Sequence, residues 1–141
     1  MLVREVMNKQ VVTAKQEISL KEASKVMVDM RIGCLLILEN EKILGIITST
    51  NILKAVAAGN DPETTLVESF MSKDVKTIEP DKTIEDAVDI MTQNKIKKLP
   101  VVEEGKIVGI ITASDIVTIE PRLIENIASL MSMRLPGYSG G

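Results

Sequence analysis

The sequence predicts a mixed α+β fold built from two tandem copies of one unit. The first observation is an internal repeat, because the chain aligns on itself 64 positions apart, without a gap, from Met7/Met71 to Ile52/Ile116. The second is that each copy contains an amphipathic helical pattern followed by two short runs of branched aliphatic residues. The two copies of such a unit are expected to pack against each other.

Composition places the chain among globular proteins that bury a core without metals or disulfides. Its 141 residues are 45% hydrophobic and 26% charged. The longest apolar stretches, such as residues 34–38, are far shorter than the roughly 18 to 20 residues that cross a bilayer. Arg4 and Glu5 interrupt what would be the apolar part of a secretory signal. A cytoplasmic protein is therefore expected.

Residue counts argue against several classes of function. The single cysteine, Cys34, cannot form an internal disulfide, and with no histidine the usual Cys and His sets of zinc ligands cannot be assembled. The net charge of −3 provides no global field for nucleic acid, and the only aromatic residues are Phe70 and Tyr138. No required cofactor or metal is predicted, and nucleic acid is a minor hypothesis that rests on the lysines of residues 95–98.

The first helix of each copy is predicted from a capping box. Ser19 is followed three residues later by Glu22, and Thr83 is followed three residues later by Asp86. After each start, apolar residues recur at helical spacing, namely Leu20, Ala23, Met27 and Met30 in the first copy and Ile84, Ala87, Val88 and Met91 in the second.

A hairpin and a second helix complete each copy. Asn40 and Gly105 suit tight turns between the aliphatic runs, so each pair of runs is predicted to form a hairpin. The helix after the first hairpin is expected to end at Gly59, and the helix after the second is stopped by Pro121.

These signals divide the chain into a first repeat over residues 1–58, an exposed linker over 59–65 and a second repeat over 66–120. A last helix is predicted over 121–135, because a proline suits its first turn and its apolar residues recur on one face. That helix is expected to cover the core or a neighbouring subunit. Residues 136–141 are expected to form a flexible tail.

The end of each hairpin is the predicted functional corner, because a helix start leaves backbone N–H groups unpaired and favours anions. In the second copy Thr112 and Asp115 are three residues apart, so the hydroxyl and the carboxylate can face one small volume. The carboxylate suits the hydroxyls of a ribose, and Thr112 and Ser114 can reach a phosphate. Lys97 and Lys98, just before the other strand, add two cations.

A purely structural explanation competes with this one. Thr-x-x-Asp is also close to a capping box, in which both side chains only satisfy N–H groups of their own helix. Two lysines at the start of a strand are also common on solvated surfaces. Both explanations stay open at this point.

Together these features resemble the cystathionine-β-synthase (CBS) domain. The resemblance covers Met7 to about Val117 and rests on the stretch LPVVEEGKIVGIITASDI and on a motif present in both copies: glycine, two aliphatics, Thr or Ser, two residues, then Asp or Asn. It implies a pseudo-twofold pair of β-α-β-β-α units, often called a Bateman module. Many members bind adenine nucleotides in clefts between the copies and regulate another protein.

The resemblance also implies the ligand-binding residues. In the second copy Asp115 would hold ribose hydroxyls, Thr112 and Ser114 would lie near ribose or phosphate, and Ile110 would give apolar contact. Lys98 would meet phosphate. The counterparts in the first copy would be Ile46, Thr48, Thr50 and Asn51, and the base would be contacted near Ile32, Gly33, Ile96 and Lys97.

The two corners are unequal in sequence. Asn51 lacks the charge of Asp115, and the first copy has no counterpart of the lysine pair. At least one site is therefore predicted, and the second stays open. The expected regulatory ligand is AMP, ADP or ATP, ahead of S-adenosylmethionine or NAD. A homodimer, an unidentified regulated partner and no membrane contact are also expected.

Two other functions are considered. A structural or adaptor protein without a nucleotide ligand would use the same motifs only as helix caps, and its last apolar helix for contact with a partner or a second copy. An enzyme is disfavoured, because the sequence supplies no histidine, no cysteine pair and no nucleophile with a base.

Overall fold

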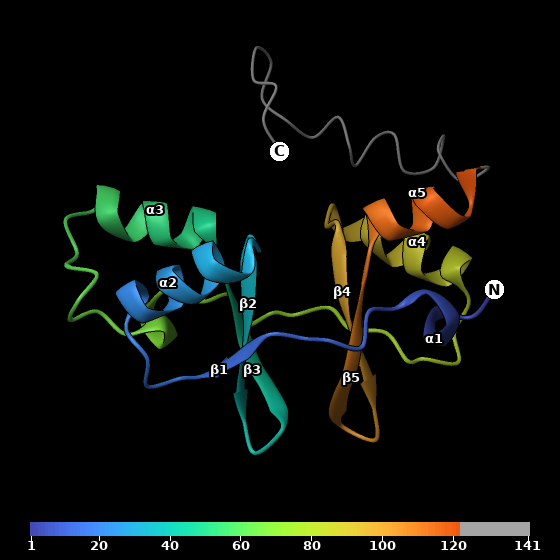
Figure 1. Ribbon diagram of the computed structural model, residues 1–141, viewed down its shortest axis with the longest axis horizontal. Coiled ribbons are helices and arrows are strands. Elements are labelled where there is room, and N and C mark those ends of the chain that lie inside the picture. The colour runs from blue at the N-terminus through green and yellow to red at the C-terminus, as the bar shows by residue number, and fades with distance from the viewer. Residues whose placement is uncertain (122–141) are drawn as a thin grey trace, which may run out of the picture. The chain divides into compact units, whose positions relative to one another are not determined.

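The computed structural model describes residues 1–121, which form two compact units that each contain helices and a small sheet (Figure 1). One unit is Val12–Val75, and the other combines Met1–Val11 with residues 76–121. The predicted mixed α+β class is confirmed. The helix predicted over 121–135 lies, apart from its first residue, outside the described residues, as does the predicted tail.

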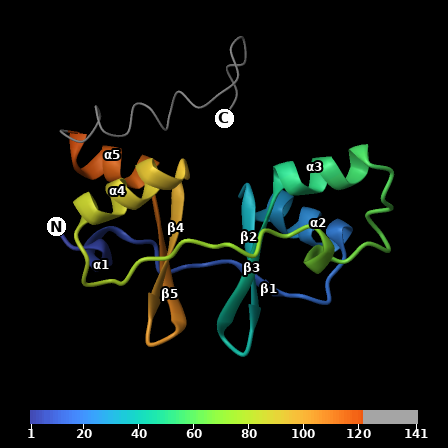
Figure 2. The same cartoon turned by 180° about the vertical axis from the view of Figure 1, so that it is seen from behind.

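The unit of residues 12–75 contains a three-stranded sheet and two main helices. Its elements are β1 (Thr13–Lys15), α2 (Leu20–Met30), β2 (Cys34–Glu39), β3 (Lys42–Thr48), α3 (Ser49–Ala57) and the 3-10 turn η1 (Val67–Ser69). The strand order is β1-β2-β3, with β1 parallel and β3 antiparallel to β2. Both helices lie on one side of the hairpin (Figures 1 and 2), where Leu35, Ile37 and Ile47 join the core.

The other unit has the same plan with a smaller sheet. Its elements are α1 (Val3–Val6), α4 (Ile84–Asn94), β4 (Lys98–Glu103), β5 (Lys106–Thr112) and α5 (Ala113–Ile119). The first strand of this repeat is reduced to a parallel bridge of Ile78 with Val101. The Val102 N–H donates to the Ile78 carbonyl. The next N–H on this edge of β4 would belong to residue 100, which is a proline and has none, so the parallel ladder cannot extend.

The hairpin turns form where the sequence predicted them. Asn40 and Glu41 have φ of 53° and 67°, and Glu104 and Gly105 have φ of 52° and 79°. Two consecutive residues with positive φ define the type I′ turn, whose twist matches that of the flanking strands. Each hairpin also contains a β-bulge. The strand register shifts between Ile37 and Leu38 in β2, and between Val101 and Val102 in β4.

The predicted capping boxes are also confirmed. The Glu22 N–H donates to the Ser19 hydroxyl at 3.1 Å, and the Glu22 carboxylate accepts from the Ser19 N–H at 3.3 Å. Both reciprocal bonds between Thr83 and Asp86 are 3.1 Å long. The pKa of Asp86 is lowered by hydrogen bonding to its carboxylate. The backbone N–H of Thr83 has the larger effect, and the Thr83 side chain the smaller one.

The segment predicted as a linker is bonded to the start of α2. The Leu20 N–H donates to the Thr65 carbonyl at 2.8 Å, and the Lys21 N–H donates to the Pro62 carbonyl at 2.9 Å. The Lys21 ammonium also pairs with Glu63 at 2.8 Å. These bonds satisfy N–H groups that a helix start otherwise leaves without partners.

Each unit takes a short N-terminal segment from the other sequence repeat, which the sequence analysis did not predict. Asn8 exchanges two backbone hydrogen bonds with Ile110 of β5, at 2.8 and 2.9 Å, and Ser72 exchanges two with Ile46 of β3, both at 2.9 Å. The helical turns just before these bridges contribute to the same cores: α1 to the core with α4 and α5, and η1 to the core with α2. The repeats 1–58 and 66–120 therefore describe the sequence, while the compact units divide the chain near residues 11 and 75.

Glycine at the matched positions 45 and 109 permits these backbone crossings. A Cβ at Gly45 would lie 2.7 Å from the Ser72 carbonyl oxygen and 2.8 Å from the Met71 sulfur. A Cβ at Gly109 would lie 2.7 Å from the Met7 sulfur and 3.1 Å from the Asn8 carbonyl oxygen. Both distances to sulfur are shorter than van der Waals contact, but a methionine side chain can move and a hydrogen-bonded carbonyl cannot.

We therefore expect Gly45→Ala to destabilise the protein more than Gly109→Ala. Overpacking of this kind costs about 1–3 kcal/mol, and Gly45→Ala should lie at the upper end because its nearest neighbour is backbone. Urea denaturation of both variants measures the difference. Adding Met7→Ala to Gly109→Ala should recover part of the loss, whereas equal losses for the two single variants would contradict this account of the crossings.

Residues 1–121 contain no helix with both the length and the apolarity needed to span a bilayer.

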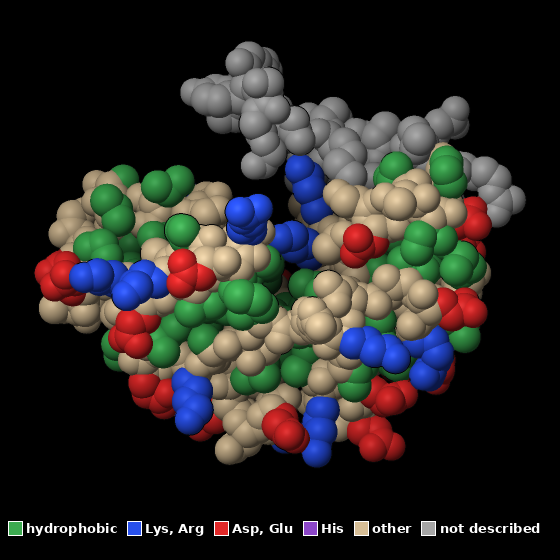
Figure 3. All heavy atoms as spheres, in the orientation of Figure 1, with side chains coloured by type: hydrophobic (Ala, Val, Ile, Leu, Met, Phe, Trp, Pro, Cys, Tyr) green, Lys and Arg blue, Asp and Glu red, His purple; other side chains and the backbone are tan. Residues whose placement is uncertain are grey.

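Charges of both signs are interspersed over the face drawn in Figure 3. The main apolar exception is on α2 and α3, where Val28 is 75% exposed and Leu53 is 68% exposed. Hydrophobic side chains are visible over α3 in the same view.

Candidate functional site

The corner of the second repeat lies where β5 meets α5, beside the start of β4. Lys98 and Thr112 are cross-strand partners, so their side chains lie on the same face of the hairpin, next to that of Ile110. Leu99 and Ile111 point to the opposite face and are completely buried in the core. The hairpin therefore brings three of the predicted site residues together.

A backbone bond holds the helix start against the strand start in each repeat. The Ala113 N–H donates to the Lys97 carbonyl at 2.8 Å, and the Ser49 N–H donates to the Gly33 carbonyl at 3.1 Å. The Asp115 N–H donates to the Thr112 hydroxyl at 3.1 Å. Two of the first three N–H groups of α5 are thus already paired, so this helix start offers an anion fewer backbone donors than the sequence pattern predicted.

The residue three positions after the capping threonine differs between the corners. In the first repeat, Asn51 closes a full capping box, because its side-chain oxygen accepts from the Thr48 N–H at 3.0 Å while its own N–H donates to the Thr48 hydroxyl at 3.1 Å. In the second repeat, only the bond from the Asp115 N–H to Thr112 forms. Within residues 1–121 the half-buried Asp115 carboxylate accepts no hydrogen bond.

The other predicted residues occupy matched places in the two units. Ile32 and Ile96 precede the hairpins and pack, half-buried, against the cores of their units. Ile46 is half-buried and its backbone carries the bridge to Ser72. Thr50 and Ser114 are exposed on the first turns of α3 and α5.

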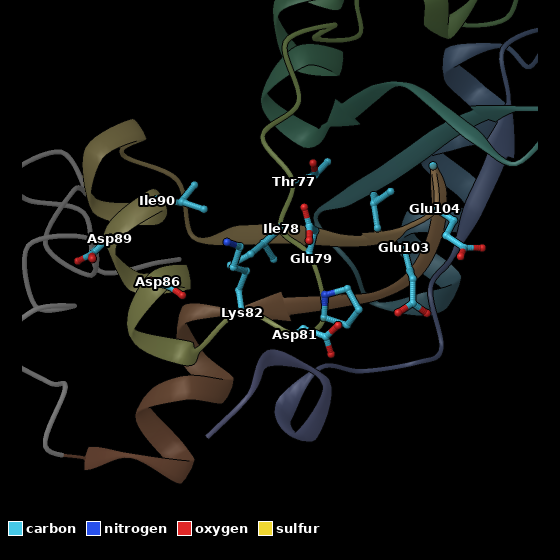
Figure 4. Close-up of a pocket in the computed structure, with 13 residues that line it drawn as sticks. Thr77, Ile78, Glu79, Asp81, Lys82, Asp86, Asp89, Ile90, Glu103 and Glu104 are labelled. Carbon is cyan, nitrogen blue, oxygen red and sulfur yellow. The ribbon is translucent and has the colours of Figure 1, made fainter.

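Two hollows lie within single units. One, of about 350 Å³, lies between α2 and α3 and is mainly apolar; of the predicted residues it includes only Ile32. A larger one, of about 760 Å³, contains none of them and lies beside the start of α4 and the turn of the β4–β5 hairpin (Figure 4). The sequence analysis missed it, although the acidic residues at the start of α4 were a signal. Among the described residues no group of three or more acidic or cysteine side chains could hold a metal ion.

The fold and the corners define a protein made of two repeated units that each place a capped helix after a β-hairpin. The family model for the CBS domain matches residues 3–58 and 67–121. The chain therefore belongs to the CBS domain family and carries two copies of the domain.

Several relatives and solved structures support this assignment. An uncharacterised protein of Methanopyrus kandleri is 33% identical over 92% of this chain and 67% of its own length. The CBS domain-containing protein YhcV of Bacillus subtilis is 30% identical over 81% of both chains. The crystal structure of the CBS domain pair of protein MJ0100 in complex with 5′-methylthioadenosine and S-adenosyl-L-methionine matches with a TM-score of 0.77 and 31% identity, over 86% of this chain and 97% of that one.

Similar pairs also occur inside larger proteins. The homoserine O-acetyltransferase of Methanohalobium evestigatum is 35% identical over 87% of this chain, but the match covers only 24% of that protein.

The asymmetry of the corners predicts different effects on stability. Asn51→Ala should lower the free energy of unfolding by about 1 kcal/mol, because it leaves the Thr48 N–H without its acceptor. Asp115→Ala should cost less than about 0.5 kcal/mol, through its interaction with the helix dipole alone. Thr48→Ala and Thr112→Ala are matched controls with equal expected losses, since both hydroxyls accept the same 3.1 Å bond. Urea denaturation without ligand measures all four, and equal losses for Asn51→Ala and Asp115→Ala would contradict the difference.

Proposed function

We propose that the chain is a regulatory ligand-sensing module that binds an adenosine-containing ligand at the corner of the second repeat and passes its binding state to a partner protein. The observation that carries the proposal is the Asp115 carboxylate, which stands three residues into α5 and is not used to cap its own helix. An ionised carboxylate with both oxygens available suits the paired hydroxyls of a ribose.

The neighbouring residues supply the remaining contacts. The oxygen of the Thr112 hydroxyl accepts from the Asp115 N–H, so its proton stays available for donation to the ligand. Lys98 lies on the same hairpin face as Thr112, and with Lys97 it favours a ligand that carries phosphate. Ile110 offers an aliphatic contact for the base. The MJ0100 pair, whose complex holds two adenosyl compounds, supports the adenosyl class.

The proposal predicts saturable binding that depends on one charge. AMP, ADP, ATP, NAD, S-adenosylmethionine and methylthioadenosine are compared by thermal shift and by calorimetry, because a ligand that binds only the native state raises its melting temperature. Asp115→Asn should weaken binding by about 10-fold or more, because a hydrogen bond to a charged group is worth roughly 1.5–3 kcal/mol.

Asn51→Ala is the matched control. It removes the equivalent side chain of the other repeat, so it should lower the melting temperature without ligand while leaving the affinity of the Asp115 corner unchanged. The proposal is wrong if no compound raises the melting temperature at millimolar concentration, or if Asp115→Asn binds as tightly as the natural sequence.

A second candidate function is a structural or adaptor protein that forms homo-oligomers. One observation favours it: Val28, Met30, Leu53 and Val56 are 49–75% exposed on α2 and α3. Of these, Val28 and Leu53 also line the apolar hollow between the two helices. Three of the four counterparts in the second repeat are polar, namely Thr92, Asn94 and Glu120, and the fourth is Val117. A homodimer that buries the apolar face is compatible with either function.

This candidate predicts that Val28→Glu with Leu53→Glu lowers the oligomeric state measured by light scattering, because carboxylates would have to be buried in the contact. The control is Thr92→Glu with Thr118→Glu, which adds the same charge at exposed positions on α4 and α5 of the other unit. A monomeric natural sequence at high concentration would contradict a homo-oligomeric adaptor.

A further inference from the structure

The hollow of about 760 Å³ combines an apolar floor with an acidic rim. It lies within the unit that contains the second repeat and is lined by residues 77–82, α4 and the end of the β4–β5 hairpin (Figure 4). Ile78, Ile90 and Val102 provide its aliphatic surface. The lining also includes six carboxylates and one lysine: Glu79, Asp81, Asp86, Asp89, Glu103, Glu104 and Lys82.

Three of the six carboxylates have structural roles. Asp81 and Glu103 both pair with Arg4, which fixes the N-terminal turn beside the hairpin. Asp86 closes the capping box of α4 with Thr83. These contacts explain why acids occupy these positions, and they leave the groove with most of its negative charge.

The other three carboxylates have no such role. Within residues 1–121 the exposed side chains of Glu79, Asp89 and Glu104 form no hydrogen bond or ion pair. In Figure 4 they come from the 77–82 segment, from α4 and from the hairpin turn, so they surround the groove from three elements. Unpaired charges of one sign that are spread around one hollow repel each other and stabilise nothing in the unit itself.

The first repeat shows that the fold does not require these charges. At the positions 64 residues earlier, Lys15 replaces Glu79, Lys25 replaces Asp89 and Asn40 replaces Glu104. The same helix and the same type of hairpin therefore form with two of the charges reversed. The acids with structural roles are kept in the first repeat, where Glu17, Glu22 and Glu39 match Asp81, Asp86 and Glu103. Only the three unpaired acids are therefore peculiar to the second repeat, and an external cation is the simplest reason for them.

The spacing of the acids indicates what kind of cation fits. Among the described residues no three acidic side chains are close enough to hold a metal ion. Charges dispersed around an aliphatic floor suit instead an extended partner that carries several separated cations on an apolar body. The volume of the groove, about 760 Å³, is in the range of pockets that enclose a drug-sized group, so the groove has room for a few side chains of such a partner.

We propose that this groove docks a segment of a partner protein in which lysine or arginine alternates with aliphatic residues. The cationic side chains pair with Glu79, Asp89 and Glu104, while the aliphatic ones cover Ile78, Ile90 and Val102. The groove includes none of the residues assigned to the adenosyl corner, so it forms a separate binding surface. Its existence does not depend on the identity of the adenosyl ligand.

A short synthetic peptide that alternates lysine with leucine and valine is the probe, and fluorescence anisotropy measures its binding to the full chain. Glu79→Lys with Asp89→Lys places in the second repeat the residues that the first repeat carries, so the variant is expected to fold. It should bind the peptide at least about tenfold more weakly than the natural sequence, because like charges now face each other. Methyl NMR signals of Ile90 and Val102 should shift on binding.

The control variant Asp29→Lys with Glu68→Lys makes the same change in net charge on exposed residues of the other unit. It should keep the affinity of the natural sequence. The proposal is overturned if both variants weaken binding equally, if a peptide with its lysines replaced by glutamate binds as well, or if spermine binds as tightly as the peptide. If the chain self-associates and Glu79→Lys with Asp89→Lys abolishes that self-association, a second copy of the chain is the occupant instead of a partner protein. Adenosyl binding is measured in both variants as well. If it is retained, a failure of the groove proposal is distinguishable from a failure of the proposed adenosyl site.

Discussion

The close backbone crossings at Gly45 and Gly109 are the constraint on which the rest of the structure depends. Each glycine lets a neighbouring chain segment approach near enough to exchange two hydrogen bonds with the middle of a hairpin strand. The segment that is held there carries a helical turn into the core, α1 in one unit and η1 in the other. Its preceding residues also cap a helix, since the Met1 carbonyl accepts from the Ile84 N–H and the Thr65 carbonyl from the Leu20 N–H. In each unit one glycine, Gly45 or Gly109, thus allows a single segment to pair with the hairpin, pack in the core and cap a helix.

Sequence reasoning succeeded where the determining interactions are local. The turns at Asn40 and Gly105 and the boxes at Ser19 and Thr83 depend on residues within a few positions of each other, and all formed as predicted. The exchange of N-terminal segments depends on contacts across the chain, so periodicity could not assign it. A weak signal did exist, because Leu2 and Val3 match Leu66 and Val67 at the repeat spacing, which extends the repeat to the segments that pack in the other unit. The repeat pattern indicates that the two segments are similar, but it does not show in which core each of them packs.

The capping pattern alone could not distinguish the two candidate corners either. Asp86 and Asp115 both stand three residues after a threonine N-cap, yet only Asp86 closes a box with it. Asn51, which looks like the weaker ligand residue, is the one whose side chain satisfies its own helix. The difference depends on side-chain conformation, which residue type and spacing do not determine. Duplication makes the comparison informative, because two copies of one scaffold show which polar groups the fold uses and which it leaves available.

The hairpin of β4 and β5 connects the two surfaces for which we propose a function. Lys98 and Thr112 lie at its open end, beside the adenosyl corner, while Glu103 and Glu104 lie at its turn, on the rim of the acidic groove. Both surfaces also share α4 and α5 through one core that contains Met91 and Ile116. If occupation of the corner changes the affinity of the groove for a basic segment, linkage requires the segment to change the affinity for the adenosyl ligand by the same factor. Under the two proposals, both surfaces lie in one unit, so the coupling between them would pass through the core that α4, α5 and the hairpin share.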